Sequence, residues 1–209
     1  MGAEALELLA QAREASGLPI VTEVLDVRDA ARAAEVADVL QVGARNMSNM
    51  ALLRELAGTG RPILLKRGFG STLEELLGAA EYIFAEGNED IVLVERGIRT
   101  FETATRFTLD LAAVPVLRER THLPIIIDPS HAAGASRWVP DLARAAAAVG
   151  ADGIMVEVHD DPASALSDAD QALELDEFAS LVASLDPILA AVGRQRVRLE
   201  IATSLAANA

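Results

Sequence analysis

Basic side chains follow three consecutive apolar runs of this sequence, and they are the first candidates for chemistry. Arg45 lies in GARN, Lys66 in LLKRG, and Arg96 and Arg99 in ERGIRT. Guanidinium groups bind phosphate and carboxylate through paired N–H donors, and lysine supplies a point charge. The cluster predicts a site for an anionic small molecule, and for each single residue an ion pair at the rim of a sheet is the alternative.

A second group combines one imidazole with two carboxylates. His131 follows the apolar run LPIIID, Glu157 follows GIMV, and Asp168 comes eleven residues later. This donor set suits a divalent metal such as manganese or iron. Taken singly, His131 could be a structural histidine held by a hydrogen bond, and Glu157 could pair with a neighbouring arginine.

Lys66 is the only lysine of the chain, beside 17 arginines. A lysine buried among arginines could form a Schiff base, so a lysine-dependent aldolase stays open. An arginine-rich coding background would also leave a single lysine by chance. The sequence contains no GxGxxG, GxxxxGK[ST], GxSxG or HExxH pattern, which argues against dinucleotide, P-loop, serine hydrolase and zinc protease sites.

Alternating strands and helices must position these residues. Near-continuous apolar runs predict strands that are buried on both faces of a parallel sheet. They lie at 19–25, 38–42, 62–66, 91–94, 123–128 and 153–159. Segments with helical periodicity predict helices at 3–15, 29–37, 49–56, 72–85, 105–118, 139–148 and 174–192.

This βα pattern brings the candidate residues to one edge of the fold. Parallel strands present their carboxyl ends on the same side, where α/β proteins bind ligands. Two architectures fit six βα units: an open doubly wound sheet, or a (β/α)8 barrel that lacks two units. Periodicity does not choose between them.

Composition excludes several classes of protein. The net charge of -14 argues against nucleic acid or an anionic membrane as partner. The chain has no cysteine, so disulfides, thiol nucleophiles and cysteine metal ligands are absent. With no membrane span and no secretory signal visible, we expect a soluble, cytoplasmic protein.

Six motifs carry a resemblance to a known family. They are GARNM (43–47), LLKRG (64–68), ERGIRTFE (95–102), DLAAVPVL (110–117), THLPIIIDPSH (121–131) and EVHDDPxxALSD (157–168). In this order and spacing the chain resembles the 3-deoxy-D-arabino-heptulosonate 7-phosphate (DAHP) synthases of microbial type Iβ, from about residue 2 to 193. The related 3-deoxy-manno-octulosonate 8-phosphate synthases share the barrel and are the alternative.

The resemblance implies a (β/α)8 barrel of the class I aldolase type, a transferase that condenses phosphoenolpyruvate with erythrose 4-phosphate. This is the first step of the shikimate route to aromatic amino acids. It implies that Arg45, Lys66 and Arg96 grip phosphoenolpyruvate, that Lys66 and His131 are catalytic, and that Arg99 meets the sugar phosphate. It also implies a divalent metal, Mn²⁺ or similar, on His131, Glu157 and Asp168, and a homo-oligomer.

The sequence departs from the family at its start. The family barrel begins with two further βα units, which carry a GPC metal ligand and a KPRTSP substrate segment, and neither segment is present. We therefore expect an N-terminally truncated barrel over residues 1–193, with its first two strands missing, followed by a tail over 194–209. An internal start codon is the favoured explanation, with a split gene or an oligomerising or regulatory fragment as alternatives. We expect little synthase activity from the 209 residues alone, and a non-catalytic module that binds phosphoenolpyruvate or phosphate is the second functional hypothesis.

Overall fold

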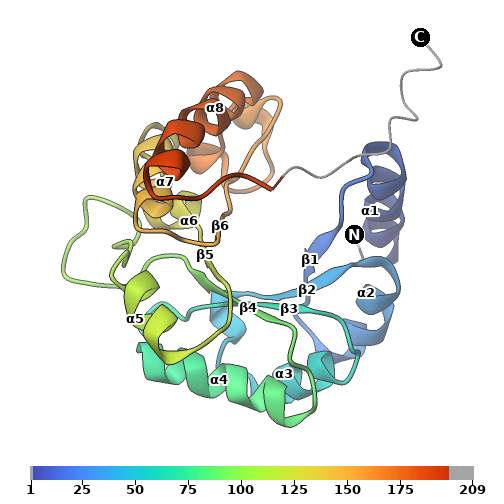
Figure 1. Cartoon of the computed structure of the whole chain (residues 1–209). Helices are drawn as coiled ribbons and strands as arrows, with labels where there is room; N and C mark the ends of the chain where they lie inside the picture. The colour runs from blue at the N-terminus through green and yellow to red at the C-terminus, as the bar shows by residue number, and fades with distance from the viewer. Residues whose placement is uncertain (1, 198–209) are drawn as a thin grey trace.

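The computed structural model describes residues 2–197. It consists of a curled parallel sheet with helices on its outer side (Figure 1). The strands are β1 (Val21–Glu23), β2 (Val39–Val42), β3 (Ile63–Lys66), β4 (Ile91–Glu95), β5 (Ile125–Ile127) and β6 (Gly153–Ile154). The α-helices are α1 (Gly2–Ser16), α2 (Ala30–Val36), α3 (Met50–Ala57), α4 (Leu73–Ala85), α5 (Ala113–Arg120), α6 (Pro129–Ala133), α7 (Val139–Ala148) and α8 (Leu175–Ala191).

The six strands lie side by side in chain order, and every neighbouring pair is parallel. A doubly wound sheet reverses its strand order at a switch point, and this sheet does not. The winding is that of a barrel. Within the described residues β1 and β6 pair with one strand each, so the barrel is incomplete. Which strands of a full barrel these six represent stays a prediction.

Continuous apolar sequence explains the central strands. All four residues of β3 are buried, and so are four of the five residues of β4. Helices α2 to α5 cover the sheet through a large core that includes Leu40, Leu53 and Ile83. A smaller core joins α6, α7 and α8 around Val139 and Leu181. Figure 1 shows α7 and α8 at one end of the curl and α1 at the other.

Helix starts follow local capping signals. Thr72 accepts a hydrogen bond from the Glu75 amide (3.1 Å), and Glu75 accepts one from the Thr72 amide (2.8 Å), which is a capping box at the start of α4. The side chain of Asn49 caps α3 through the Leu52 amide. These signals are local in sequence, so the predicted starts of α3 and α4 fall within one residue of the observed ones.

The helix expected over 105–118 is wrong in its first half, because α5 begins at Ala113. The backbone of Thr108 instead forms an antiparallel bridge with Ile98, and the Phe107 amide donates to the Ala132 carbonyl (2.9 Å). These contacts between distant segments hold residues 97–112 as an ordered loop over the carboxyl end of the sheet. The short helix α6, which begins at Pro129, was not predicted from the sequence.

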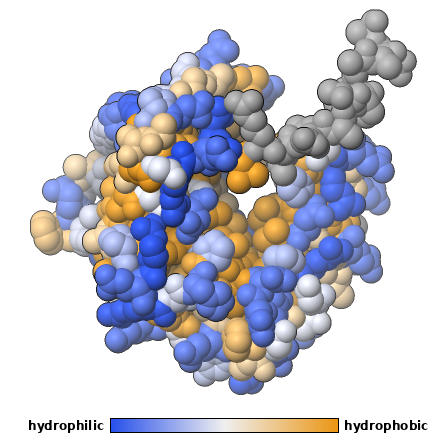
Figure 2. Space-filling model, in the orientation of Figure 1, coloured by the Kyte–Doolittle hydropathy of each residue, from blue (hydrophilic) through white to orange (hydrophobic). Residues whose placement is uncertain are grey.

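The two ends of the curl carry apolar side chains at the surface. Leu18, Val21 and Leu25, beside and in the edge strand β1, are each more than 40% exposed. In Figure 2, orange apolar surface borders the opening between the α7–α8 end and the α1–α2 end. No helix among the described residues is long and apolar enough to cross a membrane. Of the tail predicted over 194–209, residues 198–209 lie outside the described part of the chain.

Candidate active site at the carboxyl ends of the strands

Lys66 and His131 meet on one buried carboxylate. Lys66 ends β3, and its Nζ lies 2.8 Å from Oδ2 of Asp128, the residue that follows β5. Nδ1 of His131 lies 2.8 Å from the same oxygen. The Asp128 side chain is fully buried and that of Lys66 is 7% exposed. This pairing is typical of a charged clamp rather than of a free nucleophilic amine.

Asp128 is a site residue to which the sequence analysis gave no role. Its Oδ1 accepts a hydrogen bond from the His131 amide (3.0 Å) and so caps α6. Burial alone raises the pKa of Asp128, but the contacts with His131 and Lys66 outweigh burial and lower it to about 2. An Asp–Pro pair with a histidine three residues on is a helix-start signal that could have indicated this role.

Arg96, directly after β4, is a buried cation. It is 3% exposed, and its Nη1 is buried with no hydrogen-bond partner among the described residues. The pKa of Arg96 is lowered to about 10, mainly by burial. The nearby charges of Arg106 and Arg45 also lower it, whereas those of Asp128 and Glu95 raise it. A buried guanidinium N–H without an acceptor costs free energy, so an anion bound there would be stabilised.

The neighbouring Arg67 is fully neutralised instead. Its Nη1 lies 2.8 Å from both Glu95 Oε2 and Asp110 Oδ2, and its Nε donates to the Ser71 carbonyl (2.8 Å). Burial raises the pKa of Glu95. Burial alone would lower the pKa of Arg67, but the two carboxylates raise it. This network ties the ends of β3 and β4 to the loop over residues 97–112, and it was missed because Asp110 is distant in sequence.

Arg45 and Arg99 lie at the exposed margin of the site. The Arg45 side chain is 70% exposed, and its Nη2 lies 4.0 Å from Oε1 of Glu23 at the end of β1. Arg99 is exposed, and its amide donates to the Phe69 carbonyl (2.6 Å). The structure thus brings Arg45, Lys66 and Arg96 to one edge of the sheet.

Gly97 allows the chain to turn sharply behind Arg96. Its φ is +93°, and a Cβ there would lie 2.6 Å from Cβ of Phe107 and 3.1 Å from Cα of Ala132. Gly87 has a similar φ of +86° with no atom within 4 Å of a Cβ. We expect Gly87→Ala to lower the free energy of unfolding by about 1 kcal/mol, through strain alone. We expect Gly97→Ala to lower it by about 3 kcal/mol, because overpacking adds to the strain. Urea denaturation checks both values, and equal losses would contradict the close packing.

The three predicted metal ligands are only partly brought together. His131 Nε2 lies 3.6 Å from Glu157 Oε1. Asp168 pairs instead with Arg106, at 3.0 Å, and its φ of +54° is unusual for a residue other than glycine. The described residues contain no group of three His, Cys, Asp or Glu side chains placed to hold a metal ion. As arranged, these residues do not fit a complete metal site. A divalent metal held jointly by His131, Glu157 and Asp168 stays a prediction.

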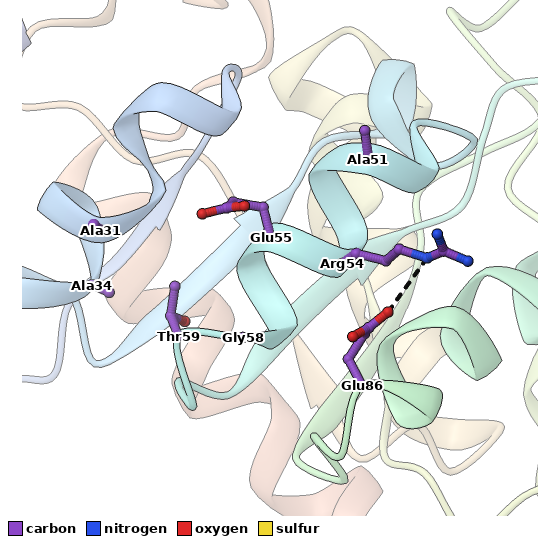
Figure 3. Close-up of a pocket in the computed structure, with 8 residues that line it drawn as sticks. All are labelled: Ala31, Ala34, Ala51, Arg54, Glu55, Gly58, Thr59 and Glu86. Atoms are coloured by element: carbon purple, nitrogen blue, oxygen red, sulfur yellow. Dashed lines mark ion pairs between the residues drawn. The ribbon is translucent and has the colours of Figure 1, made fainter.

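A large cavity of about 790 Å³ lies elsewhere, in the outer helical layer (Figure 3). Ala31 and Ala34 of α2 line it, together with Arg54 and Glu55 of α3 and Glu86 after α4. Arg54 and Glu86 pair at 3.4 Å, as the dashed line in Figure 3 shows. Gly58 and Thr59, also in its lining, precede β3 at the amino ends of the strands. The cavity is therefore separate from the candidate site.

Comparison with known proteins agrees with this geometry. A family model described as the DAHP synthetase I family matches residues 1–190. The chain belongs to this family. A relative from Thermotoga maritima, named phospho-2-dehydro-3-deoxyheptonate aldolase, is 50% identical over 193 residues. A 2-dehydro-3-deoxyphosphooctonate aldolase from Nitratidesulfovibrio vulgaris is 36% identical over 194 residues.

Solved structures agree with the family assignment. A truncated form of the DAHP synthase from Thermotoga maritima superimposes with a TM-score of 0.91 at 49% identity, covering 93% of this chain and 74% of that one. The alignment with the Thermotoga maritima relative covers 92% of this chain but only 57% of that protein's length. The alignment with the Nitratidesulfovibrio vulgaris relative covers 88% of this chain and 70% of that protein. The fold and family are thus shown over most of this chain, whereas the activity of the relative belongs to a longer protein.

Proposed function

We propose that this chain forms the greater part of a 3-deoxy-7-phosphoheptulonate synthase, which condenses phosphoenolpyruvate with erythrose 4-phosphate. In this proposal the six strands are the third to eighth of a (β/α)8 barrel. The observation that carries it is the buried Arg96, whose Nη1 has no hydrogen-bond partner within residues 2–197, together with the buried pair of Lys66 and Asp128. Phosphoenolpyruvate carries a phosphate and a carboxylate and needs several cations.

The chemistry divides into two bond-forming steps. The C3 atom of phosphoenolpyruvate attacks the aldehyde carbon of the sugar phosphate, and the aldehyde oxygen takes up a proton to become a hydroxyl. Water adds at C2, and phosphate leaves through cleavage of the C2–O bond. The water oxygen remains as the C2 carbonyl, and its two protons balance the new hydroxyl and the leaving phosphate. In this proposal Lys66, Arg96 and Arg45 bind the phosphate and the carboxylate of phosphoenolpyruvate. Their positive charges stabilise the negative charge that develops on the leaving phosphate. Asp128 holds Lys66 and His131 in place, and Arg99 faces the sugar phosphate. Asp168 is paired with Arg106 and does not join His131 and Glu157 as a metal ligand in this arrangement.

Carbon counting separates the two activities named by the relatives. A seven-carbon product needs a four-carbon aldehyde, and an eight-carbon product needs a five-carbon aldehyde. Identity of 50% against 36% favours the seven-carbon product. Both sugar phosphates should be offered to the protein.

The first test is loss of phosphoenolpyruvate, followed by absorbance, with the purified chain and each sugar phosphate. Parallel reactions contain manganese or a chelator, and phosphoenolpyruvate binding is measured by calorimetry. The same measurements are made on a longer protein, in which the remaining part of the barrel is joined to this chain. We expect both proteins to bind phosphoenolpyruvate and only the longer one to turn it over. Failure of both proteins to bind phosphoenolpyruvate would refute the proposal, and binding without turnover in either would favour the non-catalytic module.

Arg45 offers a variant that does not disturb the core, since its side chain is 70% exposed. We expect Arg45→Met to weaken phosphoenolpyruvate binding about tenfold, because a charge-assisted hydrogen bond contributes roughly 1.5 kcal/mol or more. Arg120→Met is the matched control, since Arg120 is an exposed arginine at the end of α5 whose contact to Glu74 is 3.9 Å. Calorimetric affinities equal for the two variants would remove Arg45 from the site.

A further inference from the structure

We propose that Phe69 and Phe107 are positioning residues that hold the Arg96 guanidinium so that it can bind an anion. The inference rests on the proposed function and adds residues to that site. Phe69 lies in the loop after β3, and Phe107 lies in the loop over residues 97–112. The two rings are stacked, with centroids 5.1 Å apart and an interplanar angle of 9°. The Arg96 Cζ lies 4.9 Å from the Phe69 centroid and 4.3 Å from the Phe107 centroid.

The site contains two buried arginines with opposite kinds of partner. Arg67 donates hydrogen bonds to two carboxylates and a carbonyl. Arg96 lies against two aromatic rings, and its Nη1 has no hydrogen-bond partner in the part of the chain that the structure describes. A ring face attracts a cation without using an N–H donor, whereas a carboxylate would compete with an anionic ligand. The aromatic contacts therefore offset part of the cost of burial while leaving the donor available.

Backbone contacts fix both rings. The Arg99 amide donates to the Phe69 carbonyl (2.6 Å), so the loop after β3 is tied to the loop after β4. The Phe107 amide donates to the Ala132 carbonyl (2.9 Å) in α6. The turn at Gly97 brings the backbone against Cβ of Phe107. The rings are thus located by segments that follow β3, β4 and β5, and this placement is what a positioning role requires.

The experiment compares Phe69→Leu and Phe107→Leu with wild type by two measurements. The first is the chemical shift of the Arg96 side-chain Nε–H, which the ring currents of the two phenylalanines should displace. The signal is identified by its loss in Arg96→Lys. The second is the affinity for phosphoenolpyruvate and for inorganic phosphate, measured by calorimetry. Phe107→Tyr keeps a ring face and serves as the conservative variant. Phe84→Leu is the matched control, since Phe84 is a 50% exposed ring on α4.

We expect each site leucine variant to reduce the ring-current displacement and to weaken phosphoenolpyruvate binding at least fivefold. Phe107→Tyr should keep both properties, and Phe84→Leu should change neither. Unchanged affinity in both site leucine variants, or an undisplaced Arg96 signal in wild type, would overturn the inference. If wild type binds neither phosphoenolpyruvate nor phosphate, the proposed function fails. The NMR signal of Phe107→Leu then still decides whether the rings hold the guanidinium.

Discussion

Replacing Asp128 with asparagine is expected to lower the free energy of unfolding by about 4 kcal/mol, because it leaves the Lys66 charge buried without its partner. Lys66 Nζ lies 2.8 Å from Asp128 Oδ2, and both side chains are buried. Asparagine keeps the oxygen that caps α6, so the change isolates the lost charge from the lost cap. Urea denaturation at pH 7 measures the difference.

Asp26→Asn is the matched control for this substitution. Asp26 also caps a helical turn and also pairs with a basic residue, Arg28, but that pair is exposed. We expect its unfolding midpoint to stay close to that of wild type, because exposed ion pairs contribute little. Adding Lys66→Met to Asp128→Asn should recover part of the loss, since the buried Lys66 charge is then removed together with its partner. A loss in Asp128→Asn no larger than that in Asp26→Asn would contradict the buried pair.

Acid titration tests the same carboxylate independently. Because the pKa of Asp128 is lowered from 3.8 to about 2 in the folded chain, the unfolded chain binds its proton first as the pH falls. The stabilisation is therefore complete above about pH 5 and is lost as the pH falls through 4 towards 2, at a cost of about 2 kcal/mol. Asp128→Asn should lose less stability than wild type over this range. Parallel acid profiles would contradict the lowered pKa.

Replacing Arg67 with methionine is expected to have a similar cost, about 4 kcal/mol, because Glu95 would be left buried without a cation. Both Glu95 Oε2 and Asp110 Oδ2 lie 2.8 Å from Arg67 Nη1, and the Glu95 side chain is fully buried. Arg120→Met is again the control, at an exposed ion pair. Equilibrium denaturation of the two variants should differ by nearly the whole predicted loss.

The free energy of unfolding of the Arg67→Met variant should depend on pH with the opposite sign to the contribution of Asp128 in the wild type. Burial already raises the pKa of Glu95, and removing the cation raises it further. A folded chain that binds the Glu95 proton more tightly than the unfolded chain becomes relatively more stable as the pH falls through that pKa. The variant should therefore recover part of its loss towards pH 5, and Arg67→Met with Glu95→Gln should recover it at pH 7. No recovery in either condition would show that Glu95 does not depend on Arg67.

Local patterns predicted most of the secondary structure but failed where distant segments meet. The helix α7 has the predicted bounds, 139–148, because its periodicity and its early proline are local signals. Residues 105–112 have helical periodicity as well, yet they form a loop. Their hydrogen bonds go to Ile98 and to the carbonyls of Ala132 and Ala133, and no local signal describes those partners.

The sequence by itself determined the parallel βα order, the candidate cations and, through six motifs, the family, because each depends on residue type and spacing along the chain. The tertiary structure decided which of these residues touch. It joined Lys66 and His131 through Asp128 and neutralised Arg67. It packed Arg96 against a stacked pair of aromatic rings, with one donor that has no hydrogen-bond partner among the described residues. It also paired Asp168 with Arg106. Such pairings depend on side-chain burial and direction across strand ends that are tens of residues apart, and a one-dimensional pattern carries neither.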